Sequence, residues 1–230
     1  MSATKIMEPE DAIQNVKTGD ILMVGGFGLI GSPLTLINEL TRHDARELTV
    51  ISNNVGESGK GLGILLQQGK LKKAVGSYFT SNRDVAKSYN EGKLELELLP
   101  QGTFSEAIRA GGAGIGGFYT KTAAGTDLAK GKETKVIDGE TYLLEKPLKA
   151  DVALIRAWKS DMKGNLVFYK TARNFNPVMA TAADYVIAEV DEIVGEGELS
   201  PEEIVTPHLF VDAIITSRLI LTKEGVKEIG

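Results

Sequence analysis

The sequence predicts an α/β fold in which a mostly parallel sheet is flanked by helices. Short aliphatic and β-branched runs alternate with amphipathic stretches along most of the 230 residues, a pattern typical of helices packed on a parallel sheet. Several runs are apolar on successive residues, as expected for strands that are covered on both faces. No repeat of fixed period and no linker-like composition interrupts the chain, so we expect a single domain over residues 1–230.

Seven strands are expected from these aliphatic runs. They cover residues 20–24, 48–52, 73–77, 94–99, 152–156, 185–190 and 213–216. Residues 135–144 have a different pattern, because apolar and polar side chains alternate in KVIDGETYLL on both sides of Asp138-Gly139. An Asp-Gly pair between alternating residues is the signature of a two-residue hairpin turn. The sequence therefore also predicts a small antiparallel hairpin flap.

Six helices are expected between the strands. They cover residues 9–16, 33–42, 62–68, 83–90, 104–110 and 177–183. Ser32-Pro33 and Asn176-Pro177 each place a capping side chain before a proline at the first helical position. Thr103 and Glu106 have the spacing of a capping box. Three glycines stand where left-handed C-terminal caps belong, namely Gly19, Gly69 and Gly92.

The composition excludes several classes of chemistry. Lys and Arg number 26 against 31 Asp and Glu, and the net charge of −5 argues against a nucleic-acid or anionic membrane surface. The chain has no cysteine, which excludes disulfides, thiolate nucleophiles and Fe–S clusters, and with only two histidines we expect no metal site. No apolar run approaches the roughly 20 residues of a membrane span, and residues 1–12 lack an apolar signal core, so we expect a cytoplasmic protein.

A glycine-rich turn follows the first predicted strand in VGGFGLIGSP. Gly26, Gly28 and Gly31 match the dinucleotide fingerprint G-x-G-x-x-G between a strand and a helix. Glycines let backbone amides approach an anion, and the N-terminus of the next helix adds partial positive charge. The turn is therefore expected to be either a phosphate site or a tight β–α turn that only packs the helix closely. An NAD site also needs an acidic residue at the tip of the second strand, but Asn53 and Asn54 stand there, which weakens that interpretation.

A glutamine and a second glycine-rich stretch follow the fourth predicted strand, in LPQGTFSEAIRAGGAGIGGFYT. Ligands bind at the carboxyl ends of parallel strands, where the Gln101 amide could donate a hydrogen bond to a developing oxyanion; a satisfied surface residue is the alternative. Gly112, Gly114 and Gly117 repeat the fingerprint, but they follow a predicted helix, so we expect no phosphate turn there. The stretch 111–117 suits a lid or a groove wall for an extended ligand.

Three other ionisable residues receive structural interpretations. Glu57 in VGESGKG follows a strand, but we interpret it as a solvated acid and not as a nucleophile. His43 is expected in an exposed loop. His208 is expected to be structural.

The remaining polar and aromatic candidates are also ambiguous. Asn174 and Asn176, with Arg173 in ARNFNP, can position a substrate carboxylate or cap a helix, and the cap is the preferred interpretation. Some aromatic residues can stack an adenine, but a place in the core is preferred for them. They are Trp158, Phe118 and Tyr119.

Five characteristic stretches occur in the order VGGFGLIGSP, LPQGTFSEAIRAGGAGIGGFYT, YLLEKPLKADVALIRAW, GNLVFYKTARNFNP and IVTPHLFVD. Together they resemble the family I coenzyme A transferases. Their order is similar to that of the α (A) subunit of 3-oxoacid CoA-transferases, with a succinyl-CoA and acetoacetate pair as first choice and acetate or butyrate with acetoacetate as second. An NAD-binding oxidoreductase and a non-catalytic sensor of a phosphorylated metabolite remain as alternatives.

The resemblance implies a ping-pong reaction. A glutamate carboxylate attacks an acyl-CoA thioester and gives an acyl–glutamyl anhydride, which CoA converts to a glutamyl thioester before a second acid takes the CoA. In this family the glutamate lies in a Ser-Glu-Asn-Gly motif of the β (B) subunit. That motif is absent from these 230 residues, so the resemblance implies that the partner is a B subunit, in an α2β2 assembly.

The resemblance also assigns site residues and ligands. The oxyanion-hole glutamine of the family falls on Gln101. The loop that contacts CoA falls on Gly25, Gly26, Phe27, Gly28, Leu29, Ile30 and Gly31. Coenzyme A is then a substrate, and no permanently bound cofactor is expected.

Overall fold

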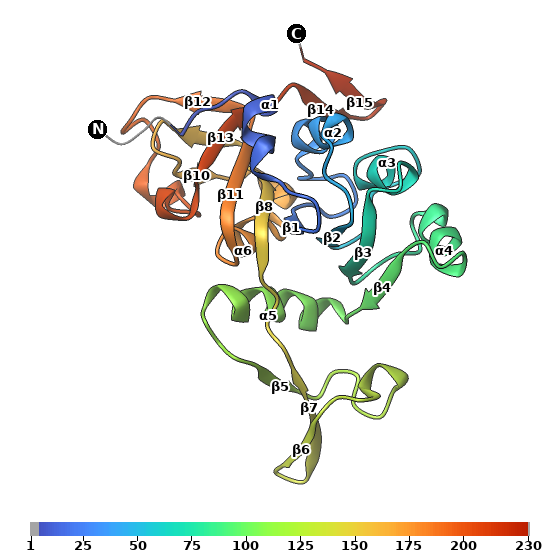
Figure 1. Cartoon of the computed structure of the whole chain (residues 1–230). Coiled ribbons are helices and arrows are strands. Elements are labelled where there is room, and N and C mark those ends of the chain that lie inside the picture. Colours follow the sequence, from blue (N-terminus) through green and yellow to red (C-terminus); the bar gives the residue numbers. More distant parts are fainter. Residues whose placement is uncertain (1–4, 230) are drawn as a thin grey trace.

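A seven-stranded parallel sheet forms the centre of the molecule in the computed structural model, which describes residues 5–229 (Figure 1). Its strands are β1 (Ile21–Val24), β2 (Leu48–Ile51), β3 (Leu71–Gly76), β4 (Glu95–Leu98), β8 (Ala150–Arg156), β11 (Ala183–Val190) and β13 (Ala213–Thr216), in the order β13-β11-β8-β1-β2-β3-β4. These are the seven strands that the sequence predicted. Residues 1–4 of the N-terminal stretch considered for a signal lie outside the described residues.

Both faces of this sheet are buried, which explains the continuous apolar runs. Leu22 and Val24 of β1 point into one apolar cluster and Met23 into the other, and all three are fully buried. A strand covered on both sides has no polar face, so its apolar residues follow one another without alternation.

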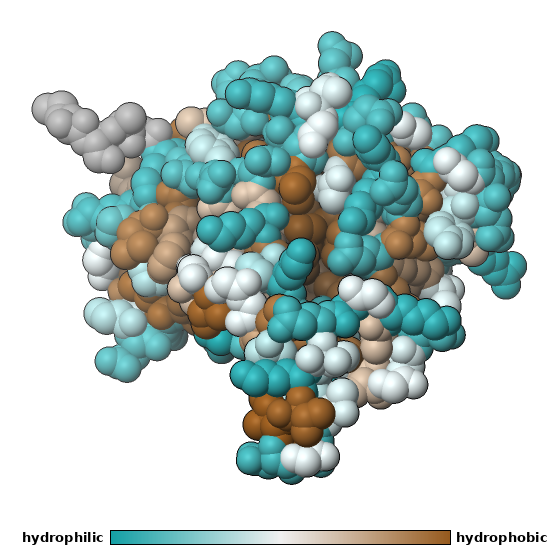
Figure 2. All heavy atoms as spheres, turned by 60° about the horizontal axis from the view of Figure 1, so that its bottom comes forward, coloured by the Kyte–Doolittle hydropathy of each residue, from teal (hydrophilic) through white to brown (hydrophobic). Residues whose placement is uncertain are grey.

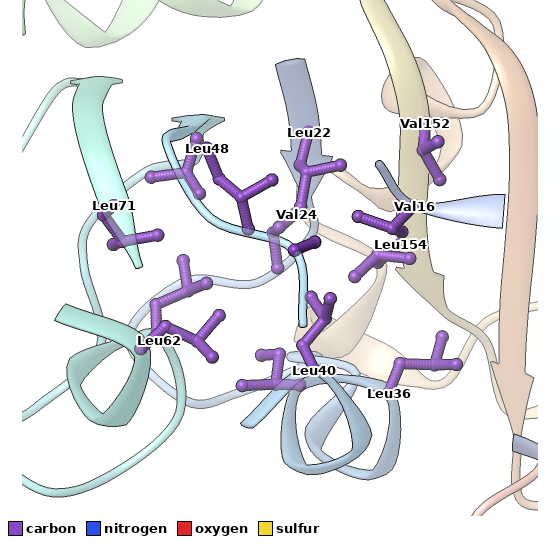
Figure 3. Packing of buried hydrophobic residues seen from close by; sticks show 14 of the residues in the cluster. Val16, Leu22, Val24, Leu36, Leu40, Leu48, Leu62, Leu71, Val152 and Leu154 are labelled. Atoms are coloured by element: carbon purple, nitrogen blue, oxygen red, sulfur yellow. The ribbon is translucent and has the colours of Figure 1, made fainter. Parts of the chain in front are cut away.

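Helices form the outer layers. One face is covered by α1 (Pro9–Ala12), α2 (Leu34–Arg42), α3 (Leu62–Gln67) and α4 (Arg83–Asn90), and the other by α5 (Gln101–Gly112) and α6 (Asn176–Met179). Figure 3 shows Leu36 and Leu40 of α2 facing Leu154 and Val24 of the sheet. The α/β prediction is therefore confirmed.

The predicted hairpin flap is also present. Strands β5 (Phe118–Thr120), β6 (Thr134–Ile137) and β7 (Glu140–Glu145) form an antiparallel sheet in the order β5-β7-β6. Asp138 and Gly139 at its turn have φ of 49° and 79°, as a two-residue hairpin loop requires. The flap projects beyond α5 in Figure 1, and Figure 2 shows apolar atoms near its end.

Several short elements were not predicted. Strands β9 (Lys159–Asp161), β10 (Leu166–Val167) and β12 (Glu192–Val194) form a small sheet, and β14 (Leu219–Thr222) pairs with β15 (Gly225–Glu228). Short 3₁₀ turns occur at η1 (Ile13–Asn15), η2 (Asp127–Ala129), η3 (Lys170–Arg173), η4 (Pro201–Glu203) and η5 (His208–Phe210). Their brevity leaves no periodic signal in the sequence.

Three helix boundaries differ from the prediction. The expected helix 9–16 is α-helical only to Ala12 and continues as the 3₁₀ turn η1. The expected helix 177–183 is a single turn that ends at Met179, because Ala183 already belongs to β11. The expected helix 104–110 begins earlier, at Gln101, so Thr103 lies inside α5 and forms no capping box. The Thr103 hydroxyl is buried and has no hydrogen-bond partner within residues 5–229.

The predicted caps have mixed outcomes. Gly69 and Gly92 follow α3 and α4 with φ of 66° and 68°, as predicted, whereas Gly19 lies in a loop beyond the 3₁₀ turn that extends α1. Ser32 and Asn176 make no side-chain cap in the described structure, where Pro33 and Phe175 occupy the N-cap positions. The reason at α2 is that a residue from a distant strand takes over the capping.

The carboxylate of Glu189, at the end of β11, caps α2. Its Oε2 accepts hydrogen bonds from the backbone amides of Thr35 at 3.0 Å and Leu36 at 3.2 Å. Its Oε1 lies 2.7 Å from Arg156 Nη1 and 2.6 Å from the Ser217 hydroxyl. Glu189 is completely buried, and this burial raises the pKa of its carboxyl, while Arg156 and the hydrogen bonds act in the opposite direction.

Replacement of Glu189 with Ala should lower the free energy of unfolding by about 3–5 kcal/mol, because the buried side of Arg156 and the first amides of α2 lose their partner. Urea unfolding followed by circular dichroism measures this loss. Glu192→Ala is the control, since Glu192 makes an exposed ion pair with Lys159. A loss no larger than in the control would contradict the role of Glu189.

Candidate active site

The loops that follow the parallel strands meet at the carboxyl edge of the sheet, and both groups of predicted site residues lie there. Residues 25–31, called the glycine turn below, follow β1, and Gln101 follows β4. In the strand order, β2 and β3 separate β1 from β4. With neighbouring strands about 4.8 Å apart, the glycine turn and Gln101 are roughly 14 Å apart along this edge. The structure therefore places them on one edge but not in contact.

Gln101 is an exposed residue in a well-anchored position. Leu99 extends the pairing of β4 by donating its amide to Gly76 O at 2.9 Å, and Phe104 in the first turn of α5 is fully buried. The strand end and the helix start on either side of Gln101 are thus fixed. Its carboxamide makes no hydrogen bond with any of residues 5–229, so its N–H groups are available to a ligand.

The glycine turn is a tight hairpin with an apolar tip. The amide of Phe27 donates to Ile30 O at 3.0 Å, and the amide of Ile30 donates to Phe27 O at 3.2 Å. Gly28 between them has φ of 63°, a conformation that favours glycine. The side chains of Phe27 and Ile30 are 50% and 48% exposed, so the tip presents apolar surface at the edge of the sheet.

The glycines at the two ends of the turn make room for other parts of the chain. A Cβ atom on Gly25 would lie 1.8 Å from Asn176 Oδ1, and one on Gly31 would lie 2.4 Å from Ala172 O. Both distances are shorter than any van der Waals contact. Close packing, the second of the two interpretations, therefore accounts for Gly31 of the fingerprint and for Gly25 before it, whereas a Cβ at Gly28 would meet no described atom within 4 Å.

The expected phosphate site at α2 is wrong. Its N-terminal amides already bond to the Glu189 carboxylate, so an incoming anion would meet a buried negative charge. Asn53 donates to the Ser77 hydroxyl at 2.8 Å, and Asn54 accepts from the Gly56 amide at 2.9 Å. Both asparagines are buried and directed into the protein, so neither faces a ribose, and the dinucleotide interpretation fails.

The ionisable residues outside these loops have structural contacts. Glu57 is exposed and pairs with Lys60 at 3.2 Å, which agrees with a solvated acid. His43 is half-buried and not fully exposed as predicted, because its Nδ1 accepts from the Ala45 amide beyond α2. In the described part of the chain, only the backbone of His208 makes structural contacts, its oxygen accepting from Lys5 at 2.6 Å, while its side chain is exposed.

The aromatic candidates are outside the main core, contrary to the prediction. Trp158 is 38% exposed and lies 5.2 Å from the ring of Tyr169, because the chain leaves the sheet directly after β8. Phe118 and Tyr119 are half-buried in the flap, where the Tyr119 hydroxyl donates to Glu133 at 2.8 Å. The hydrogen bond and the charge of Glu133, together with desolvation, raise the pKa of Tyr119.

The second glycine-rich stretch contributes packing at its start. Gly111 and Gly112 belong to α5, and Cβ atoms there would lie 1.9 Å from Leu148 O and 2.2 Å from Thr181 Oγ1. These two glycines therefore let α5 approach neighbouring backbone, and neither belongs to a lid. Between residues 5 and 229, no group of three His, Asp or Glu side chains is arranged to hold a metal ion, and no helix is long and apolar enough to cross a membrane.

Sequence reasoning named Asn174 and Asn176 but preferred the wrong role for them, and it missed Glu189. Asn174 and Asn176 contact the turn and do not act as helix caps. Glu189 was hidden within an apolar strand. A charged residue in such a run needs a buried partner, and that signal was available in the sequence YVIAEV.

Replacement of Gly25 with Ala should lower the free energy of unfolding by about 1–3 kcal/mol, because its methyl group would overlap Asn176 Oδ1. Thermal and urea unfolding measure the change. Gly102→Ala is the matched control, since a Cβ at Gly102 meets no described atom within 4 Å. Equal stability of the two variants would contradict the close contact at Gly25.

Comparisons with known proteins agree with this architecture. Residues 6–217 match the family model described as Coenzyme A transferase. The α (A) subunit of a probable succinyl-CoA:3-ketoacid coenzyme A transferase from Bacillus subtilis is 48% identical over 206 residues, covering 90% of this chain and 87% of that protein. The alpha subunit of acetate CoA-transferase from Escherichia coli is 45% identical over 215 residues, covering 94% and 98%.

Solved structures share the fold at lower identity. An acyl-CoA transferase from E. coli O157:H7, solved as a thioester complex with CoA, superposes with a TM-score of 0.82 at 22% identity. The match covers 93% of this chain and 47% of that one, so this chain spans about half its length. Glutaconate coenzyme A-transferase from Acidaminococcus fermentans gives a TM-score of 0.79 at 22% identity, covering 93% and 76%. With a family model matched over nearly its whole length, the chain belongs to the coenzyme A transferase family.

Proposed function

We propose that this chain is the α (A) subunit of a heteromeric CoA-transferase that moves CoA from succinyl-CoA to acetoacetate. The observation that carries the proposal is the 48–52% identity to α (A) subunits named for succinyl-CoA:3-ketoacid coenzyme A transferase, over most of both chains. Acetate or butyrate with acetoacetate is the second candidate, because the alpha subunit of acetate CoA-transferase is 45% identical. The cytoplasmic location stays a prediction.

A partner β (B) subunit completes the proposed enzyme. The Ser-Glu-Asn-Gly motif is absent from the sequence, so the nucleophilic glutamate has to come from another chain. Large apolar side chains exposed at the carboxyl edge support a partner on this side, because monomeric proteins rarely expose many of them together. They are Phe27, Ile30, Tyr78, Leu98, Trp158 and Tyr169. An α2β2 assembly is proposed from the family resemblance alone.

Gln101 is the proposed oxyanion donor of this reaction. The glutamate carboxylate of the partner attacks the thioester carbonyl, whose oxygen becomes negatively charged, and the Gln101 N–H stabilises that charge. The CoA thiolate then leaves, and an acyl–glutamyl anhydride forms. Attack of the thiolate on the glutamyl carbonyl releases the first acid and leaves a glutamyl thioester. The acceptor carboxylate reverses these steps, and neither direction needs a general base.

The glycine turn is the proposed contact for CoA, which acts as a substrate and not as a bound cofactor. Within the described residues, the amides of Gly28 and Leu29 at the tip have no acceptor in the chain. A cavity of about 380 Å³ beside the turn is lined by residues that include Ile30, Arg156 and Leu221. An apolar wall with a few polar groups suits an extended pantetheine arm.

The purified chain alone should transfer no CoA from succinyl-CoA to acetoacetate, and addition of the β subunit should restore the transfer, because the nucleophile belongs to the partner. Chromatography of the CoA esters measures the product, and size-exclusion chromatography checks assembly. Replacement of succinyl-CoA by acetyl-CoA tests the second candidate pair. A covalent glutamyl adduct on this chain by itself would contradict the proposal.

Gln101→Ala should lower the turnover of the complex by about 10²–10³-fold, because one oxyanion donor is lost. Steady-state kinetics of the complex with the β subunit measures the change, with assembly checked by co-elution. Gln68→Ala, at the C-terminal end of α3 and so at the opposite edge of the sheet, is the matched control. Unchanged turnover in Gln101→Ala would remove Gln101 from the site.

A further inference from the structure

We propose that Asn174 is a positioning residue for the transfer reaction, because its carboxamide holds the two sides of the glycine turn in one conformation. The proposal rests on the proposed function in one respect, namely that the turn contacts CoA. Asn174 itself follows η3 and lies far from the turn in sequence, so only the folded chain brings them together.

The Asn174 carboxamide bridges the turn. Its Oδ1 accepts from the amide of Gly26 at 3.1 Å, before the tip, and its Nδ2 donates to Ile30 O at 3.0 Å, after the tip. The same group also bonds to its own loop, where Oδ1 accepts from the Phe175 amide at 2.7 Å and Nδ2 lies 3.2 Å from Ala172 O. One side chain therefore links both sides of the turn to a single loop.

The backbone of Asn174 adopts a rarely populated conformation, with φ of 22° and ψ of −120°. Such a conformation costs free energy in a residue other than glycine, and it persists only where surrounding contacts hold it. Here these contacts include the two hydrogen bonds to the glycine turn. The local strain is thus coupled to the position of the tip.

A second asparagine anchors the base of the turn and leaves the tip to Asn174. Asn176 is fully buried, and its Nδ2 donates to Gly31 O at 3.0 Å while its Oδ1 accepts from the Arg156 amide of β8 at 2.8 Å. Asn174 is only half-buried and contacts residues nearer the tip. Asn176 therefore ties the turn to the sheet, whereas Asn174 sets the conformation of its exposed part.

This arrangement preorganises the surface offered to the substrate. Gly28 at the tip gives the backbone wide conformational freedom, which a ligand would have to restrict on binding. With the Asn174 bridge in place, the amides of Gly28 and Leu29 keep one direction. Loss of the bridge should therefore weaken the reaction with acyl-CoA more than it weakens the fold.

The test compares Asn174→Gly with wild type in the assembled complex with the β subunit. Glycine tolerates the positive φ, so this variant removes the carboxamide without opposing the backbone. We expect kcat/KM for succinyl-CoA to fall about 10-fold, because the tip must be ordered during the reaction. Co-elution with the β subunit should be unchanged. Hydrogen exchange should be faster in the segment 25–32.

Asn165→Ala is the matched control. Its side chain also joins two loops, accepting from the His208 amide at 2.9 Å and donating to Asp161 Oδ2 at 2.7 Å, away from the glycine turn. It should leave both kcat/KM and exchange of the segment 25–32 at the wild-type level. Asn174→Asp keeps the acceptor for Gly26 but faces Ile30 O with an oxygen, so it should lose activity as well.

The possible outcomes separate the two proposals. An active complex in which Asn174→Gly matches Asn165→Ala in kcat/KM would overturn the positioning role alone, even if exchange became faster. A wild-type complex that transfers no CoA would overturn the proposed function and the positioning role together. A selective fall in kcat/KM with faster exchange at the turn supports both.

Discussion

The buried carboxylate of Glu189 is the interaction on which the carboxyl edge of the sheet depends. It belongs to β11, caps α2, pairs with Arg156 of β8 and accepts from Ser217 after β13. One group thus links three strands to the helix that follows the glycine turn. Because Glu189 supplies the negative charge that a helix N-terminus favours, the first amides of α2 are not free to bind a phosphate.

The glycine turn shows how one sequence pattern can have two physical causes. In a dinucleotide fold the glycines let backbone approach a pyrophosphate. Here Gly25 and Gly31 let the backbone approach Asn176 and Ala172, and the tip between them stays exposed. These two glycines therefore serve packing against a loop of the chain itself, and the residues at the tip remain as the proposed contact for CoA.

The edge of the sheet carries two parts of the proposed reaction site. The free carboxamide of Gln101 follows β4 and the apolar glycine turn follows β1, with β2 and β3 between these two strands. The side chains that follow β2 offer no free carboxylate, since Asn53 and Asn54 are buried and Glu57 is paired with Lys60. The proposed roles of these two groups are to stabilise a developing charge and to contact a long substrate. The attacking group is expected from outside.

The sequence by itself determined the seven strands, the helices α2 to α5 within a few residues, the hairpin at Asp138-Gly139 and the family motifs that contain Gln101. These features follow from local composition and spacing. Only the tertiary structure decided the strand order, the capping of α2 by Glu189, the roles of Asn174 and Asn176, and the exposure of Trp158. The physical reason is separation along the chain: Glu189 and Thr35 are 154 residues apart, and no local pattern records a hydrogen bond between such distant residues.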